Sequence, residues 1–358
     1  MNALDIAAIL VCLAASFGVV NHFTLRLPPP IGLVIIALAA SFGLIGLDAA
    51  IPGFGVADIV RHELHGIDFA EALLHGMLGF LLFAGALHVD FDTLRDQKWA
   101  VASMATIGVL ISTAIVALGF HWLAGVPFVV ALVFGALISP TDPVAVLGLL
   151  KTVKVPHSLE TKIAGESLFN DGVAYVVFLI VSAFAFAGEH DKPFGAFEAG
   201  RLFVVEAGGG ALLGGAAGWL VYRAMRRIDD YALEVLLTLA LVMGSYALAA
   251  ALHVSGPIAV VVAGLLIGHH GVRYGMSETT REHVDAFWRL IDEILNAVLF
   301  LLIGLEVLAL AFDLNHLLLG LAAIPLVLVA RLVSVGVPVG LLGLRRSFTP
   351  GAVPIMVW

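Results

Sequence analysis

The sequence predicts an all-α polytopic membrane protein. Of its 358 residues, 61% are hydrophobic and only 13% are charged, and the mean hydropathy is +1.07. Soluble domains carry roughly 25% charged residues. The charged residues here gather in short segments between apolar runs of about 20 residues, the length that a helix needs to cross a bilayer. This composition excludes a soluble enzyme and predicts a lipid bilayer as the surroundings of the chain.

Charge and cysteine content narrow the possible functions further. The formal net charge is -9, which predicts no nucleic-acid partner. Cys12 is the single cysteine, so the chain can form neither an intramolecular disulfide nor a cysteine metal cluster. We expect no bound cofactor.

Eleven apolar runs are expected to form membrane-spanning helices. They cover residues 3–23, 31–48, 70–89, 99–123, 126–150, 162–187, 197–225, 231–252, 257–270, 288–312 and 316–343. A twelfth run begins near Gly351. Segments 54–68 and 276–289 mix charged residues with hydrophobes at helical spacing, which predicts amphipathic helices on the membrane surface, with ordinary loops as the alternative.

The distribution of basic residues predicts the orientation of these spans. When alternate loops are assigned to opposite sides, three of the 18 lysines and arginines fall on one side and Arg331 lies inside a span. The other side holds fourteen, namely Arg26, Arg95, Lys98, Lys151, Lys154, Lys162, Arg223, Arg226, Arg227, Arg273, Arg281, Arg289, Arg345 and Arg346. Because basic loops stay in the cytoplasm, the N-terminus is predicted outside a cell (inner) membrane.

One run contains residues that do not suit a membrane span. Residues 139–146 read SPTDPVAV, where Pro140 and Pro143 interrupt the helix and Asp142 places a carboxylate far from either end. Freed backbone groups at this depth are tolerated only where protein or a watery cavity receives them. Transporters with inverted repeats place ion sites at such broken helices. The alternative is a simple proline kink.

The next run supplies a second polar cluster. Residues 165–171 read GESLFND, in which Glu166 and Asn170 are four apart on one helical face and Ser167 and Asp171 are four apart on the adjacent face. A single buried polar residue often serves only to hydrogen-bond one helix to another. Four polar side chains, two of them acidic, instead predict a site where one carboxyl group binds a proton and a cation alternately.

At these residues the chain resembles the cation:proton antiporter-1 family, which includes the NhaP-type sodium/proton antiporters. The similar segments, in family order, are SPTDPVAV, GESLFNDGVAYVVF, SGPIAVVVAGLLIG, NAVLFLLIGLEV and the VARLVSV that contains Arg331. The resemblance implies an inverted-repeat antiporter fold with discontinuous helices, about 13 spans in the full family and about 11 plus a stub here. It also implies a homodimer, and secondary exchange of sodium, with lithium or potassium as alternatives, for protons in pH and sodium homeostasis.

The resemblance also implies roles for individual residues. Asp171 would bind the ion or the proton, and Asp142, Thr141 and Ser167 would complete the site, with Na+ held at Asp171, Thr141 and Ser167. Asn170 would be the neutral neighbour that makes exchange electroneutral. Arg331 would pair with Glu166. Ala84 stands where many relatives carry an acidic residue, so a fourth oxygen ligand is expected to be absent or replaced by water.

Domain boundaries follow from the same resemblance. The implied dimerisation domain comprises residues 1–90 and 231–312, the ion-binding core comprises residues 98–187 and 316–358, and residues 197–225 form the linker helix. The core is expected to be incomplete, because relatives continue beyond PIMVW. The alternative function is therefore a transport-inactive, truncated membrane protein. An intramembrane hydrolase is not expected, because no nucleophile and base, nor two histidines at helical spacing, lie inside a span.

Overall fold

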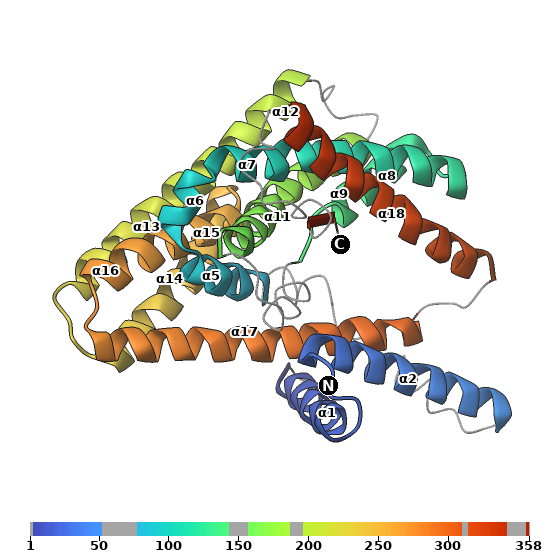
Figure 1. Cartoon of the computed structure of the whole chain (residues 1–358), viewed down its shortest axis with the longest axis horizontal. Helices are drawn as coiled ribbons and strands as arrows, with labels where there is room; N and C mark the ends of the chain where they lie inside the picture. Colours follow the sequence, from blue (N-terminus) through green and yellow to red (C-terminus); the bar gives the residue numbers. More distant parts are fainter. Residues whose placement is uncertain are drawn as a thin grey trace.

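The computed structural model describes residues 3–51, 77–142, 157–186, 196–309, 314–341 and 356–357. Within these ranges the regular structure is helical (Figure 1). The first half contains α1 (Ala3–Phe23), α2 (Pro29–Ala50), α5 (Leu78–His88), α6 (Phe91–Asp96), α7 (Lys98–Ser103), α8 (Val109–Ala124), α9 (Phe128–Ile138) and α11 (His157–Phe186). The second half contains α12 (Ala196–Phe203), α13 (Gly209–Met225), α14 (Tyr231–Leu252), α15 (Gly256–Leu266), α16 (Val272–Tyr274), α17 (Glu278–Glu306) and α18 (Leu314–Leu341).

Three π-helical turns join helices into longer units. They are η2 (Met104–Gly108) between α7 and α8, η3 (Val204–Gly208) between α12 and α13, and η4 (Ile267–Gly271) between α15 and α16. A 3-10 turn, η5 (Val307–Ala309), follows α17. Each π turn adds a residue to one helical turn and changes the face that the following side chains present.

Seven helical units among the described residues are long and apolar enough to cross a membrane. They are Asp5–Phe23, Pro29–Asp48, Lys98–Ala124, Leu159–Phe186, Phe197–Met225, Tyr231–Leu252 and Asn315–Gly340. Shorter apolar helices are Leu78–His88, Phe128–Ile138 and Gly256–Gly271. The chain is thus a multi-pass integral membrane protein. The predicted helix over 54–68, residues 143–156 and most of the predicted twelfth run lie outside the described residues.

α17 differs from its prediction. The sequence predicts a surface helix over 276–289 and a separate span from residue 288, but a single helix of 29 residues runs from Glu278 to Glu306. Ser277 begins it, because its hydroxyl oxygen accepts a hydrogen bond from the backbone N–H of Thr280. Neither glycine nor proline occurs before Gly304, so nothing in the sequence breaks the helix where its composition changes from charged to apolar.

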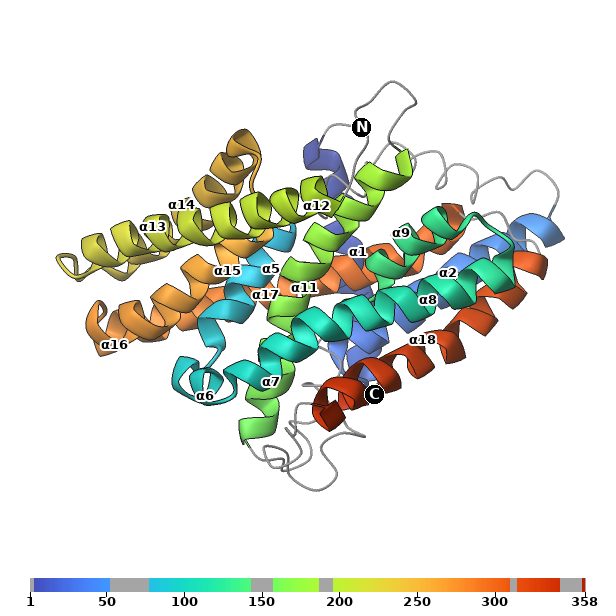
Figure 2. The same ribbon diagram turned by 90° about the horizontal axis from the view of Figure 1, so that it is seen from above.

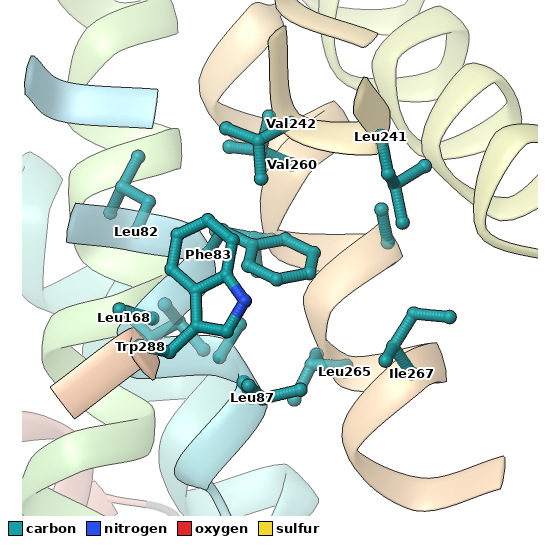
Figure 3. Close-up of a cluster of buried hydrophobic side chains, with 14 of the residues drawn as sticks. Leu82, Phe83, Leu87, Leu168, Leu241, Val242, Val260, Leu265, Ile267 and Trp288 are labelled. Atoms are coloured by element: carbon teal, nitrogen blue, oxygen red, sulfur yellow. The ribbon is translucent and has the colours of Figure 1, made fainter. Parts of the chain in front are cut away.

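One buried cluster joins α5, α14, α15 and α17 (Figure 3). The Trp288 ring of α17 lies against Phe83 of α5, with ring centroids 4.7 Å apart. The Trp288 indole N–H donates a hydrogen bond to the hydroxyl of Thr238 on α14 at 2.9 Å. Both rings are fully buried, and burying an aromatic side chain stabilises a fold by roughly 1.5–3 kcal/mol. These contacts hold four helices in fixed positions beside the polar segment of α11.

α11 lies between two groups of helices (Figure 2). On one side it contacts α5 and α15, and on the other it contacts α9 and η2. α8 packs on α9 closely at Gly135, where a Cβ atom would lie 2.5 Å from the backbone oxygen of Thr113. α18 completes this second group by packing along α8 and η2. The division of these groups into a dimerisation domain and an ion-binding core stays a prediction.

Candidate ion-binding site

The site begins where α9 ends. The helix stops at Ile138, Ser139 and Pro140 form a bend, and Thr141 and Asp142 have no regular structure. The Ser139 hydroxyl donates to the backbone oxygen of Gly135 at 2.6 Å and lies 3.1 Å from the Thr113 hydroxyl of α8. α9 therefore ends two residues before Pro140. The broken helix stays a prediction. Pro143 lies outside the described residues.

α11 brings the second polar cluster to this break. Glu166, Ser167 and Asn170 are each no more than 2% exposed, and Asp171 is half-buried. Gly172 follows directly, and a Cβ atom there would lie 3.0 Å from the Ile258 side chain. The first turn of α15 therefore packs against α11 at Gly172, the residue after Asp171.

A hydrogen bond joins the two clusters. The Asn170 side-chain N–H donates to the Thr141 hydroxyl oxygen at 2.9 Å. Asp142 follows Thr141, and its carboxylate interacts electrostatically with that of Asp171. The structure therefore brings Thr141, Asp142, Asn170 and Asp171 together, although they come from separate helices. Ser167 lies on α11 one helical turn before Asp171.

One oxygen atom of Asn170 has no partner among the residues that the structure describes. This side-chain carbonyl oxygen is buried and accepts no hydrogen bond from them. A buried polar group without a partner costs roughly 1–3 kcal/mol, so it indicates strain or a site for water or an ion. The oxygen atoms of carboxylates, hydroxyls and amides are the ligands that hard cations favour.

Glu166 faces a different partner. Arg331 on α18 donates from Nη1 and Nη2 to the two Glu166 carboxylate oxygens, at 2.5 and 2.9 Å, and from Nε to the backbone oxygen of Met356 at 3.1 Å. This is the pair that the family resemblance implies. Because the arginine neutralises Glu166, the acidic charge left in the cluster belongs to Asp142 and Asp171.

The structure adds residues that sequence reasoning missed. Asp292 of α17 interacts electrostatically with Asp142 and with His88 of α5, and it accepts a hydrogen bond from Asn296 at 3.1 Å. His88 also forms an ion pair with Asp285 at 2.8 Å. The spacing of Asp292 and Asn296, four residues apart within an apolar segment, is a signal that could have indicated a polar face.

Ala84, at which the resemblance implies an acidic residue in many relatives, is a buried residue of α5. It is 1% exposed within the buried cluster of α5, and its backbone oxygen lies 2.6 Å from Nδ1 of His88. The next polar side chain of α5 after Ala84 is that of His88, one helical turn later.

Comparison with known proteins agrees with this architecture. Residues 8–355 match the family described as "Sodium/hydrogen exchanger, transmembrane". The chain is 48% identical to the Na+/H+ antiporter NhaP of Pseudomonas aeruginosa over 99% of its own length and 85% of that protein. It is 36% identical to the Na+/H+ antiporter NhaH of Halobacillus dabanensis over 70% of its length and 62% of that protein.

The fold also matches a solved structure. The sodium proton antiporter MjNhaP1 from Methanocaldococcus jannaschii at pH 8 superposes with a TM-score of 0.77 and 18% sequence identity, covering 99% of this chain and 83% of that chain. This agreement shows the fold, and the sequence matches show the family. The chain belongs to the sodium/hydrogen exchanger family.

Proposed function

We propose that this protein exchanges sodium ions for protons across the membrane, and that Asp171 is the carboxylate that binds one or the other. The main support is the hydrogen bond from Asn170 to Thr141, which places the broken end of α9 beside Asp171. The two similar proteins support the same activity, because both are Na+/H+ antiporters.

The proposed ligands are oxygen atoms. Asp171 supplies the charge, Thr141 and Ser167 supply hydroxyl oxygens, and Asp142 adds negative potential from the adjacent loop. Arg331 has a structural role in this proposal, because its guanidinium is engaged by Glu166 and the backbone of Met356. A proton on Asp171 removes the charge that holds sodium, so the two cations compete for one carboxylate.

Competition at one carboxylate supports electroneutral exchange. Asn170 carries no ionisable proton, so each crossing of Asp171 transports either one Na+ or one H+. Asp142 keeps one protonation state throughout the cycle in this proposal. Lithium and potassium are candidates for the same site, since its oxygen ligands do not by themselves fix the size of the ion.

The cellular setting is part of the proposal. The fourteen basic residues on one side favour an N-terminus outside the inner membrane. The family resemblance supports a homodimer and a role in pH and sodium homeostasis. Export of sodium driven by the entry of protons down their gradient is the exchange that such a role requires.

The experiment is proton flux in sealed proteoliposomes that contain the purified protein and a pH-sensitive dye. Adding sodium to one side should draw protons across the membrane toward that same side in the wild type, and the Asp171→Asn variant should show no such flux. A protein that inserts correctly but shows no sodium-dependent proton movement would contradict the proposal.

A further inference from the structure

Two buried hydroxyl groups join α8 to the end of α9. The Thr113 hydroxyl oxygen lies 3.1 Å from that of Ser139, and the two residues are only 4% and 5% exposed. The Ser139 hydroxyl donates its hydrogen to the backbone oxygen of Gly135 at 2.6 Å. Because a hydroxyl carries a single hydrogen, Thr113 is the donor in the bond between the two side chains. The Ser139 hydroxyl therefore both donates and accepts.

α8 is a fixed support for this bond. The two helices lie side by side (Figure 2), and a Cβ atom at Gly135 would lie 2.5 Å from the backbone oxygen of Thr113. The rings of Phe120 and Phe134 stack between the same helices, with centroids 4.2 Å apart. Helices packed this closely do not slide past one another without losing these contacts, so the Thr113 hydroxyl keeps its position relative to α9.

The path from Ser139 to the candidate site is short. Pro140 alone separates Ser139 from Thr141, and its ring holds φ at about −65°. When Ser139 is held, few torsions remain that can move the Thr141 side chain. On its other side, the Thr141 hydroxyl oxygen accepts a hydrogen bond from the Asn170 side chain at 2.9 Å. Thr141 thus lies between two anchors, one on α8 and one on α11.

We propose that Thr113 is a positioning residue for sodium binding: its hydroxyl holds Ser139, and Ser139 and Pro140 together set the position of the Thr141 hydroxyl. This inference rests on the proposed function, in which Thr141 is an oxygen ligand of the cation. Thr113 itself does not contact the cation. A ligand that is held in place before the ion arrives loses less conformational freedom on binding, which strengthens the binding.

Positioning and simple packing have different consequences for transport. If the anchor positions a ligand, its loss weakens sodium binding and raises the half-saturating sodium concentration. Saturating sodium then restores the bound state, so the maximal rate is retained. If the anchor serves only to pack α8 against α9, its loss lowers the unfolding temperature and leaves the half-saturating concentration unchanged.

The test measures sodium-dependent proton flux in proteoliposomes at one fixed pH over a range of sodium concentrations. Thr113→Val and Ser139→Ala each remove one hydroxyl from the pair. We expect each variant to raise the half-saturating sodium concentration by about threefold to tenfold, the range expected for the loss of one buried hydrogen bond. The maximal rate should stay within about twofold of the wild-type rate. The double variant should not exceed the larger single effect, because both substitutions remove the same bond.

Thr106→Val is the matched control. Thr106 belongs to the same membrane-spanning unit, Lys98–Ala124, and its hydroxyl donates to the backbone oxygen of Ala102 at 2.6 Å, within that unit. This variant removes the same group from a position that has no bond to α9, and it should keep the wild-type half-saturating concentration. Thr113→Ser keeps the hydroxyl and should recover most of the wild-type sodium affinity.

Two results would overturn the proposal: an unchanged half-saturating concentration in Thr113→Val, or a double variant in which the two single effects multiply. If Thr113→Val fails to fold, Ser139→Ala decides, because it removes the same bond from α9. Failure of the proposed function looks different, since the wild type itself would then show no sodium-dependent proton flux.

Discussion

Arg331 and Glu166 form a two-pronged ion pair that joins α18 to α11. The Glu166 side chain is 1% exposed and that of Arg331 is 17% exposed, so water screens this pair only weakly. The guanidinium also bonds the backbone of Met356, which ties a third segment of the chain to the same point.

Breaking this pair on one side should destabilise the protein more than removing both partners. Glu166→Gln leaves the Arg331 charge buried, and we expect it to lower the free energy of unfolding by about 3–5 kcal/mol. The double variant Glu166→Leu with Arg331→Met should recover most of that loss, because no charge remains unpaired. Thermal unfolding in detergent measures both. Equal stability of Glu166→Gln and wild type would show that the pair is not a structural contact.

Removing the charge at Asp171 or at Asp142 should abolish exchange while leaving the protein folded in the membrane. Competition between a proton and a cation requires an ionisable oxygen ligand, which asparagine does not provide. The measurement is sodium-dependent proton flux in proteoliposomes for Asp171→Asn and Asp142→Asn. Glu282→Gln, an exposed carboxylate in the first turns of α17, is the control and should retain the wild-type rate. Wild-type flux from Asp171→Asn would refute the assignment.

Exchange should not depend on the membrane potential. One unbalanced charge in 100 mV corresponds to about 2.3 kcal/mol, which at about 1.4 kcal/mol per decade would shift the steady-state sodium gradient by roughly 50-fold. An electroneutral exchanger shows no shift. The measurement is sodium accumulation in liposomes at a fixed pH gradient with the potential clamped at two values. A gradient that follows the potential would show that more than one proton moves per cation.

Asp292→Asn should weaken the apparent affinity for sodium more than it lowers the maximal rate. Its charge lies close enough to Asp142 to add to the negative potential that attracts a cation. The transport rate is measured at increasing sodium concentrations, at low and at high ionic strength. Each titration gives the half-saturating concentration and the maximal rate separately. Glu293→Gln is the matched control, because that neighbouring side chain is exposed. An unchanged half-saturating concentration would mean that Asp292 acts only within α17.

Gly214→Ala should destabilise the protein, whereas Gly215→Ala should not. A Cβ atom at Gly214 would overlap the backbone oxygen of Ala259, so α13 and α15 would have to separate, at a cost of about 1–3 kcal/mol. At Gly215 the nearest atom would be 3.9 Å away, an ordinary contact, and alanine favours the helix. Thermal unfolding of the two variants compares neighbouring positions directly, and equal stability would contradict this packing.

Local features of the sequence were sufficient to predict most spans, and the prolines of SPTDPVAV agree with the end of α9 at Ile138. Apolar runs bounded by charged segments define helix lengths, and a proline removes a backbone donor wherever it lies. The family resemblance predicted that Arg331 pairs with Glu166. A guanidinium inside a membrane span also requires an acidic partner, which agrees with this prediction.

Contacts between distant helices could not be predicted in the same way. The position of Asp292 relative to Asp142 depends on the tertiary arrangement of α17 and the loop after α9, which no local pattern encodes. The continuity of α17 was missed because composition changes from charged to apolar within one unbroken helix. The π turn around Glu206 was missed because one added residue leaves the hydrophobic pattern almost unchanged.

The length of α17 has a consequence for its position in the bilayer. At 1.5 Å per residue its 29 residues span about 43 Å, more than the roughly 30 Å of hydrocarbon in a typical membrane. The sequence predicts a membrane span only from residue 288 onward, so the charged first turns of the same helix are expected to lie in the headgroups and water. Because the helix is unbroken, any tilt imposed on it by a thinner or thicker bilayer also moves Asp292 and Asn296.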